Sequence, residues 1–446
     1  MGRDPERLSR RRVIALGGGA AVSTVACAAA GDPASPDPAR PGSRPRFPVR
    51  TGLDHLVEGG FAALAGERVG IISNPTGVDG RYSHLVDLMH AHARDTGGLT
   101  IGGIFGPEHG FRGSAQAGGS EGTGIDTRTG LTVYDAYNAS QTTWETLYER
   151  AGVQTVVFDI QDVGSRFYTY IWALYDSMVA AARRGLRYVV LDRPNPVGGT
   201  AYGPMMTTRF TTAVGKKEIV QQHGMTVGEL ARFYNGEFLP TDAGRQVELE
   251  VIECSGWVPD MMGGDTDVPW VMPSPNMPTP DTALVYPGTG MFEGVASLSE
   301  GRGTTRPFEL IGGPEFDYHW SDRLNAANLP GVSFREAYFT PTFSKHVNTL
   351  CGGVQLQATD ASTFDAVRTA TAMIVTAKRI YGSAFAWRSD NWIDKLTGST
   401  RFRTMVDAGA TTDEVVGAWQ DELAAFDADR REHLLYGPYG WSASAT

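Results

Sequence analysis

The sequence predicts an α/β fold in which helices cover both faces of a parallel β-sheet. In the first half of the chain, short apolar runs typical of buried strands alternate with segments of helical periodicity. This strand–helix–strand spacing is typical of parallel sheets, because parallel strands need a long crossover connection. The composition agrees, since 446 residues with 41% hydrophobic and 20% charged residues form a globular chain with one large core or two.

The predicted elements of the first half follow one another closely. Strands are expected where Val, Ile and Phe cluster, and helices where apolar residues recur three and four positions apart. The expected strands are residues 68–74, 99–105, 154–159 and 188–192, and the expected helices are residues 83–94, 144–150 and 168–184.

The second half has a less regular pattern. A capping box at Thr226 and Glu229 begins a helix that is expected to reach residue 235, and residues 247–252 alternate like a strand. Residues 270–305 form a long stretch rich in Pro and Gly, which we interpret as an ordered loop that lines a cleft, because it is too apolar for disorder. A strand at 352–359 and helices at 364–381 and 412–435 complete the pattern.

The N-terminal residues indicate export. Residues 1–30 contain the twin-arginine pattern Ser9-Arg10-Arg11-Arg12 followed by small apolar residues, and residues 31–50 form a Pro-rich linker. Cys27 ends an imperfect lipobox and is a candidate lipid anchor, whereas Ala28–Ala30 suit ordinary cleavage. We expect a protein exported by the twin-arginine route to the extracellular space or the outer face of the membrane. Residues 51–205 and 206–446 are expected to form two α/β domains.

Several classes of function are excluded or disfavoured by composition. A formal net charge of −11 argues against nucleic-acid binding, which needs clustered Lys and Arg. Three cysteines are too few for a disulfide framework or a Cys-rich zinc site, although Cys254 and Cys351 could pair. The histidines at 84, 90 and 92 lack the spacing of a zinc motif, and no dinucleotide or phosphate-binding loop occurs. We therefore expect no metal and no cofactor.

Polar residues follow four successive strands of the predicted sheet. They are Asn74, then Glu108 and His109, then Asp159 and Asp162, and then Asp192 to Asn195. Ligands of open α/β sheets bind beyond the carboxyl ends of the strands. Each residue could also be an ordinary turn former, but together they predict a site at this edge.

Glu108 is the strongest catalytic candidate. A carboxyl group in a partly apolar cleft has its ionised form disfavoured, which suits a general acid. Asp159 or Asp162 could supply the second carboxylate that sugar hydrolysis requires, or could form a turn or a salt bridge with Arg166. Arg166, Arg302 and Arg306 could bind an anionic substrate group or could brace loops through backbone carbonyls.

Two other classes of function have weaker support. Gly118-Gly119-Ser120-Glu121-Gly122 matches the serine-hydrolase elbow, but it lacks the strand before it and the helix after it that the elbow needs. A non-catalytic cell-wall sugar-binding protein is the main alternative, with Trp172, Trp257 and Trp270 as candidate stacking surfaces or core residues.

Five sequence blocks resemble the exo-β-N-acetylmuramidases of bacterial cell-wall turnover, a family long described as a domain of unknown function. The blocks are residues 106–113 (GPEHGFRG), 158–170 (FDIQDVGSRFYTY), 191–196 (LDRPNP), 273–279 (PSPNMPT) and 299–309 (SEGRGTTRPFE). The resemblance extends over about residues 52–438. It implies a Rossmann-like first part without a dinucleotide, a smaller α/β second part and an active site in the cleft between them.

The resemblance also implies an activity. The family releases terminal N-acetylmuramic acid from the non-reducing ends of peptidoglycan fragments, and its proposed catalytic glutamate corresponds to Glu108, with His109 beside it. Asp159, Asp162 or the acetamido group of the substrate could play the second role, so the stereochemical course stays open. The candidate substrate-binding residues are Asn74, Arg166, Tyr168, Asn195, Asn276, Glu300, Arg302, Thr304 and Arg306. Relatives often have cysteine at the position of Gly290, so a pairing with Cys351 is not expected here.

Overall fold

The computed structural model describes residues 47–115 and 118–437. The expected export signal, Cys27 and nearly all of the expected linker lie outside the described residues. Among the described helices, none combines the length and the apolar character that crossing a bilayer requires.

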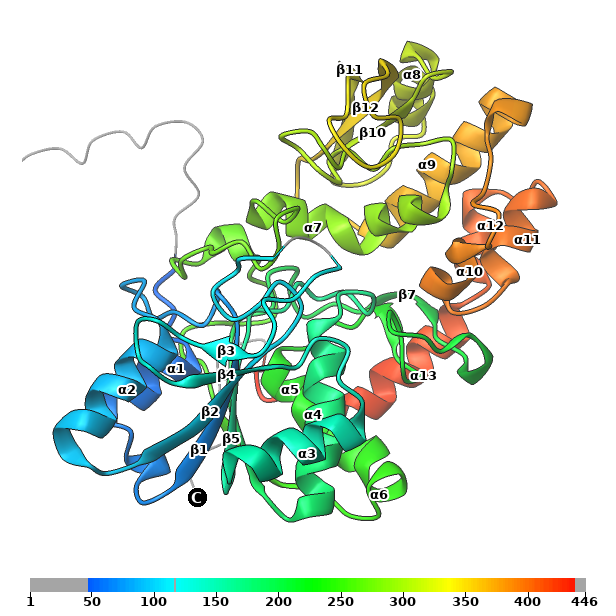
Figure 1. Cartoon of the computed structure of the whole chain (residues 1–446). Helices are drawn as coiled ribbons and strands as arrows, with labels where there is room; N and C mark the ends of the chain where they lie inside the picture. Colours follow the sequence, from blue (N-terminus) through cyan, green and yellow to red (C-terminus); the bar gives the residue numbers. More distant parts are fainter. Residues whose placement is uncertain (1–46, 116–117, 438–446) are drawn as a thin grey trace, which may run out of the picture. The chain divides into compact units, whose positions relative to one another are not determined.

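A seven-stranded sheet forms the centre of the first half of the chain, in the order β3-β4-β2-β1-β5-β6-β9 (Figure 1). All neighbouring strands are parallel except the pair β3 and β4, so the predicted parallel sheet is confirmed. The strands are β1 (Arg68–Ser73), β2 (Thr100–Gly106), β3 (Gly124–Ile125), β4 (Thr132–Asp135), β5 (Thr155–Asp159), β6 (Arg187–Leu191) and β9 (Glu248–Ile252).

Helices pack on both faces of this sheet. Successive strand residues point to opposite faces, so Ile71 and Val157 join one apolar cluster while Ile72 and Phe158 join the other. The first cluster includes residues of α1 (Gly52–Glu58) and α2 (Leu85–Thr96). The second includes residues of α3 (Gln141–Ala151), α4 (Tyr170–Arg184) and α5 (Val227–Phe233), which continues as a π-helical turn over Tyr234–Phe238.

The strand order reverses beside β1, and this reversal positions the site. From β1 the chain proceeds outward to β2 and β4, and it then returns to place β5 on the other side of β1. Such a reversal leaves a crevice at the carboxyl ends of the strands, where open α/β sheets bind ligands. β9 lies beyond residue 205, where the sequence places the end of the first domain, so the chain returns to the first sheet after that residue.

The rest of the chain contains two smaller antiparallel sheets. β7 (Tyr202–Met205) pairs with β8 (Val220–Gln222), and β12 (Cys351–Ala358) lies between β10 (Leu310–Gly313) and β11 (Val332–Phe339). Helix α8 (Tyr318–Ala326) packs against the three-stranded sheet, and α9 (Ala366–Tyr381) packs against α8. The remaining helices are α6 (Leu239–Asp242), α7 (Pro280–Thr289), α10 (Trp392–Thr397), α11 (Arg401–Asp407), α12 (Thr412–Gly417) and α13 (Gln420–Arg430).

Two predictions for the second half are wrong in detail. The stretch expected to be all loop contains α7, which packs against α9. The Thr279 hydroxyl accepts a hydrogen bond from the Thr282 amide, and Pro280 occupies the first turn, where a missing N–H costs nothing. The single helix expected over 412–435 is divided into α12 and α13, because the chain leaves helical geometry at Trp419, two residues after Gly417.

Both cysteines in the described part of the chain, Cys254 and Cys351, are buried free thiols. A Cβ atom at Gly290 would lie 2.5 Å from the ring of Phe167, so a cysteine there would require that ring to move. The glycine at this position therefore fits the close packing of the Phe167 ring.

Candidate active site

A pocket of about 160 Å³ joins the segment after β2, the start of α4 and the region expected to line a cleft. Residues from that region do line it, as the sequence predicts. The lining consists of Glu108, His109, Phe167, Tyr168, Thr169, Tyr170, Ser274, Asn276, Tyr286, Glu293 and Arg302.

Glu108 is held in this pocket by two uncharged donors. Its Oε1 accepts a hydrogen bond from the amide of Gly118 at 2.9 Å, and its Oε2 accepts one from the Thr169 hydroxyl at 3.1 Å. The side chain is partly exposed, and no Lys, Arg or His of the described residues forms an ion pair with it. Glu108 is therefore a positioned carboxyl group that remains accessible to a ligand.

The backbone after Glu108 turns sharply. His109 and Gly110 both have positive φ angles, of 70° and 81°. The loop is held by the carboxylate of Glu121, which accepts a hydrogen bond from the Phe111 amide at 2.5 Å. His109 Nδ1 lies 3.1 Å from the carbonyl oxygen of Ala115, and since a carbonyl can only accept, this contact assigns the proton to Nδ1. His109 thus helps to hold the Glu108 loop and borders the pocket.

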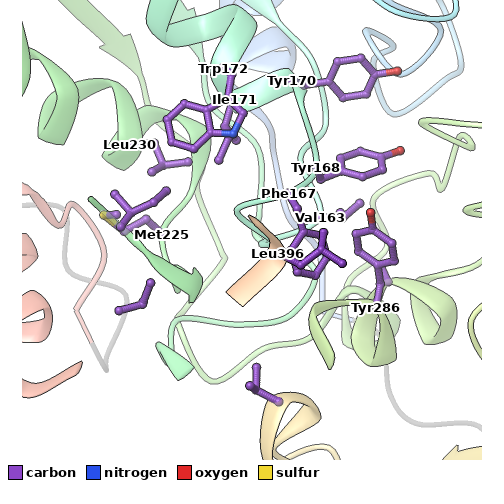
Figure 2. Packing of buried hydrophobic residues seen from close by; sticks show 14 of the residues in the cluster. Val163, Phe167, Tyr168, Tyr170, Ile171, Trp172, Met225, Leu230, Tyr286 and Leu396 are labelled. Carbon is purple, nitrogen blue, oxygen red and sulfur yellow. The ribbon is translucent and has the colours of Figure 1, made fainter. Parts of the chain in front are cut away.

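Three tyrosines form one wall of the pocket. Figure 2 shows Tyr168 between Tyr170 and Tyr286, with ring centroids 5.4 Å and 5.6 Å apart. Burial raises the pKa of all three hydroxyls above the ordinary value, so they are neutral near pH 7. The Tyr170 hydroxyl donates to the Pro273 carbonyl at 2.6 Å, which ties the proline-rich segment to the start of α4.

Arg302 and Glu293 provide the charged part of the pocket. Arg302 Nη2 donates to Glu293 Oε1 at 2.7 Å, and its Nε lies 3.4 Å from Glu300 Oε1. Burial alone would lower the pKa of Arg302, but the charge of Glu293 and the hydrogen bond to it raise the pKa above the ordinary value. The guanidinium also lies over the ring of Phe308, 5.0 Å from its centroid. Arg302 is therefore a fixed positive charge at the pocket.

Two other hollows, one smaller and one larger, share lining residues with this central pocket. The smaller, of about 40 Å³, shares Glu108, Thr169 and Tyr170 with it and is also lined by Tyr137 and Lys216. The larger, of about 440 Å³, shares Glu293 and Arg302 with it. Glu108 and Glu293 therefore each line a different neighbouring hollow in addition to the central pocket.

The sequence identifies part of this lining. Glu108, His109, Tyr168, Asn276 and Arg302 are predicted site residues that the structure brings together at the pocket. Sequence reasoning missed the others that carry polar groups, which are Thr169, Tyr170, Ser274, Tyr286 and Glu293. Thr169 and Tyr170 belong to a block already identified as similar to the family, but Glu293 lies outside the quoted blocks.

Asp159 lies outside the pocket. Its carboxylate is fully buried and binds Arg193 through two hydrogen bonds of 2.5 Å and 3.0 Å. The salt bridge considered for Asp159 thus exists, but its partner is Arg193 rather than Arg166. Since both oxygens face a buried guanidinium, Asp159 has a structural environment and not the environment of an accessible base.

Three other strand-end residues are also engaged in the interior. Asp162 Oδ2 accepts hydrogen bonds from the Gly164 amide and from His223 Nε2. Asn74 Oδ1 accepts from the amide and hydroxyl of Thr76, and Asn195 bridges Val197 and Met225. None of the three lines the pocket.

The remaining predicted binding residues also brace the structure. Arg166 is buried and donates to the carbonyls of Pro204, Ile219 and Leu396, which is the alternative role considered for it. Glu300 lies 2.8 Å from Lys345 Nζ and lines the larger adjoining hollow. The Thr304 hydroxyl donates to Gly301, and Arg306 pairs with Glu309, so neither lines the central pocket.

Ser120, Trp172 and Trp257, which are candidates for the two alternative functions, have structural roles. The Ser120 hydroxyl donates to Asp135 at 2.7 Å in an irregular segment without the strand–turn–helix context of a nucleophile. Trp172 and Trp257 are each 1% exposed, so neither can stack on a sugar from solvent.

Residues that could hold a metal ion lie elsewhere. In residues 47–115 and 118–437, the group of side chains close enough to share an ion is Glu237, Glu432 and His433, none of which lines the pocket. In a separate hollow of about 350 Å³, the carboxylates of Asp79 and Asp267 accept hydrogen bonds from backbone amides. The central pocket is lined by carboxylates, hydroxyls, the His109 imidazole, the Asn276 amide and one guanidinium.

Comparisons with known proteins agree with this geometry. Residues 69–281 match the model for the N-terminal part of the exo-β-N-acetylmuramidase NamZ family, and residues 284–436 match the model for its C-terminal part. The chain is 42% identical over 390 residues to the peptidoglycan β-N-acetylmuramidase NamZ of Bacillus subtilis, which covers 87% of this chain and 91% of that protein.

Solved structures show the same fold. A crystal structure of a DUF1343 family protein from Bacteroides fragilis superimposes with a TM-score of 0.80 at 30% identity, covering 88% of this chain and 100% of that one. A second one from the same organism gives 0.67 at 29% identity, covering 87% and 99%. Tyr286, Glu293 and Arg302 lie in the C-terminal family region and the other pocket residues in the N-terminal one, so both parts contribute to the pocket. The chain therefore belongs to the exo-β-N-acetylmuramidase family and is a glycoside hydrolase.

Proposed function

We propose that the protein releases terminal N-acetylmuramic acid from the non-reducing ends of peptidoglycan fragments, with Glu108 as the general acid. The relative from Bacillus subtilis is named as an enzyme acting on peptidoglycan, which supports this substrate class. The proposal depends most on the environment of Glu108.

A general acid must reach the glycosidic oxygen and must carry a proton when the bond breaks. Glu108 lines both the central pocket and the small hollow beside it, so a bond crossing between them would pass its carboxyl group. Its carboxyl group is held in place by an amide and a hydroxyl, and the side chain stays partly exposed to a ligand. These two features support the acid role.

The charge of the pocket supports the choice of sugar. N-acetylmuramic acid carries a lactyl carboxylate, which a guanidinium can bind through charge-assisted hydrogen bonds. Arg302 is the guanidinium of the central pocket, and its Nη1 makes no hydrogen bond within the described part of the chain. The terminal sugar would therefore occupy the central pocket, and the leaving sugar would lie toward Tyr137 and Lys216 in the small hollow.

The direct test uses the disaccharide in which N-acetylmuramic acid is β-linked to N-acetylglucosamine. The wild type should release free N-acetylmuramic acid from the disaccharide, and it should release it from the non-reducing end of longer chains. Glu108→Gln keeps the shape and hydrogen bonds of the side chain but removes the acid, so kcat should fall by about 10²–10⁴-fold.

The matched control is Glu315→Gln, which changes an exposed glutamate outside the pocket. This variant should keep the wild-type rate, and both variants should unfold at the wild-type temperature. Wild-type turnover by a folded Glu108→Gln variant would exclude Glu108 as the acid, and release of internal fragments by the wild type would exclude exo action.

Export by the twin-arginine route forms part of the same proposal, because peptidoglycan lies outside the membrane. Replacing Arg10 and Arg11 with lysine should keep the protein in the cytoplasm, whereas the wild type should be exported. The mass of the mature N-terminus then distinguishes a lipid on Cys27 from cleavage after Ala30.

A further inference from the structure

We infer that Glu293 is the second carboxylate of the reaction and acts as the general base that activates the attacking water. The inference rests on the proposed function and assigns the role that the sequence leaves open between Asp159, Asp162 and the acetamido group. Its basis is the position of Glu293 in the pocket and its ion pair.

Glu293 and Glu108 are the carboxylates that line the central pocket among the described residues. Glu108 also lines the small hollow beside the pocket, and Glu293 also lines the large one. Both also lie close enough to Tyr286 for their charges to raise the pKa of its hydroxyl, in addition to the larger effect of burial. The two glutamates therefore line the same pocket and lie near the same tyrosine.

The neighbours of the two glutamates differ in charge. Glu108 receives hydrogen bonds from an amide and a hydroxyl, whereas Glu293 Oε1 accepts from the Arg302 guanidinium at 2.7 Å. Glu293 therefore has a cationic partner, whereas Glu108 has none among the described residues. Within the described residues Glu293 Oε2 makes no hydrogen bond, so this oxygen is available to accept a proton from water. This difference in partners distinguishes the two carboxylates, and the free oxygen suits Glu293 to the role of base.

A base role for Glu293 makes water the nucleophile. When the second carboxylate attacks the sugar itself, the two carboxyl groups stand about 5–5.5 Å apart, and a wider spacing of about 6.5–9.5 Å leaves room for a water. Glu108 and Glu293 line one pocket of about 160 Å³, and each of them also lines a different neighbouring hollow. Attack by a water that Glu293 activates would invert the anomeric carbon, so we expect inversion.

The step balances as a hydrolysis. The water oxygen forms a bond to the anomeric carbon while the bond from that carbon to the glycosidic oxygen breaks. The proton of the water passes to Glu293, and the proton of Glu108 passes to the departing oxygen. One proton exchange with solvent then restores both groups.

The first test is the anomer formed initially. Wild-type enzyme acting on the β-linked disaccharide in an NMR tube should produce α-N-acetylmuramic acid before mutarotation. Initial formation of the β anomer would overturn the base role.

The second test separates base from acid by the leaving group. Glu293→Gln should lower kcat by about 10²–10⁴-fold for both the disaccharide and an activated nitrophenyl β-N-acetylmuramide, because the base acts on water and not on the leaving group. KM should change by less than about tenfold. The inference would be overturned if the loss of kcat in Glu293→Gln were much smaller for the nitrophenyl substrate than for the disaccharide. It would also be overturned if the variant kept a kcat near that of the wild type for both substrates.

Glu300→Gln is the matched control, because Glu300 contacts the same arginine but does not line the central pocket. If Glu293 acts directly, its variant should lose at least tenfold more activity than Glu300→Gln. Equal losses would show that both act through Arg302 and would overturn the base role. An inactive wild type would refute the proposed function, whereas an active wild type with an active Glu293→Gln variant would refute this inference alone.

Discussion

Two regions at the carboxyl ends of the strands contain similar polar residues but use them differently. After β1, β5 and β6, the side chains of Asn74, Asp159 and Asp192 are fully buried and bind neighbouring loops. After β2, Glu108 is partly exposed and faces the pocket together with Arg302 and Glu293. The first region is a scaffold, and the second is the proposed site of chemistry, so a polar residue at a strand end is not sufficient evidence of catalysis.

The buried pair of Asp159 and Arg193 gives the largest expected effect on stability. Asp159→Ala leaves a buried guanidinium without its partner, so the free energy of unfolding should fall by about 3–5 kcal/mol in urea titrations. The activity per folded molecule should stay close to that of the wild type.

Asp159→Asn combined with Arg193→Met provides a control that removes both charges. This double variant should recover part of the lost stability. A folded Asp159→Asn variant with a kcat reduced a hundredfold would place Asp159 in the chemistry and would break the distinction between the two regions.

The scaffold region should also make stability depend on pH. Burial raises the pKa of Asp192 to about 6 and that of Glu229 to about 7, although hydrogen bonds oppose the increase. The folded chain therefore holds protons that the unfolded chain has already lost, and its stability falls as pH rises through these values. Between pH 5 and pH 8 we expect a loss of about 2–4 kcal/mol from these two groups.

Urea titrations at pH 5, 6.5 and 8 measure this effect. Burial lowers the pKa of His84, so this histidine makes the stability rise with pH below about 6.5, which opposes the effect of the two carboxyl groups. Comparison with Glu229→Gln isolates the contribution of Glu229. The loss of stability between pH 6.5 and pH 8 should be smaller in Glu229→Gln. An identical pH dependence in both proteins would show that Glu229 is ionised throughout.

Arg302 should determine the preference for a substrate carboxylate. A charge-assisted hydrogen bond contributes about 1.5–3 kcal/mol, so kcat/KM should be at least about tenfold higher for a nitrophenyl muramide with a free lactyl group than for its methyl ester. Arg302→Met should abolish this preference. The ratio of the two substrates cancels any effect of the variant on Glu293.

Arg306→Met is the control for this measurement, because Arg306 pairs with Glu309 outside the pocket. It should keep the wild-type preference for the free acid. If Arg306→Met and not Arg302→Met removed the preference, the lactyl group would bind outside the central pocket.

The smallest expected effect is at Thr169. Thr169→Val removes the hydroxyl that donates to Glu108 Oε2 and keeps the size of the side chain. Losing this hydrogen bond should cost about 1 kcal/mol of transition-state stabilisation, which corresponds to a roughly fivefold lower kcat. Thr169→Ser should restore the rate. A loss as large as that of Glu108→Gln would indicate that Thr169 contacts the reacting atoms itself.

The parts of the fold with regular apolar patterns could be predicted from the sequence. The strands around β1 and β5 and the helices α2 and α4 occur where Val, Ile and Leu follow the periods of a strand or a helix. The helix α7 was not predicted, because Pro280, Pro287 and Gly288 are residue types that usually indicate a loop. The sequence alone does not show that Pro280 stands in the first turn of a helix, where proline is tolerated. Its formation depends on a cap at Thr279 and on packing against α9.

The pocket could be predicted only where a residue and its surroundings form one local pattern. Glu108 and His109 stand in a tight turn that is recognisable from the sequence, and positive φ angles at His109 and Gly110 realise that turn. Asp159 resembles Glu108 in sequence context, but Arg193, 34 residues away, takes both of its oxygens. Glu293 becomes recognisable only when the chain folds and brings it to the space that Glu108 faces.

The central claim is that Glu108 donates a proton to the leaving group. The most direct measurement compares kcat/KM of Glu108→Gln and the wild type for two substrates, the disaccharide and the nitrophenyl β-N-acetylmuramide. Because nitrophenolate leaves without protonation, the defect of the variant should be about 10²–10⁴-fold for the disaccharide and at least tenfold smaller for the nitrophenyl substrate. An equal defect for both substrates, or no defect for the disaccharide, would contradict the account.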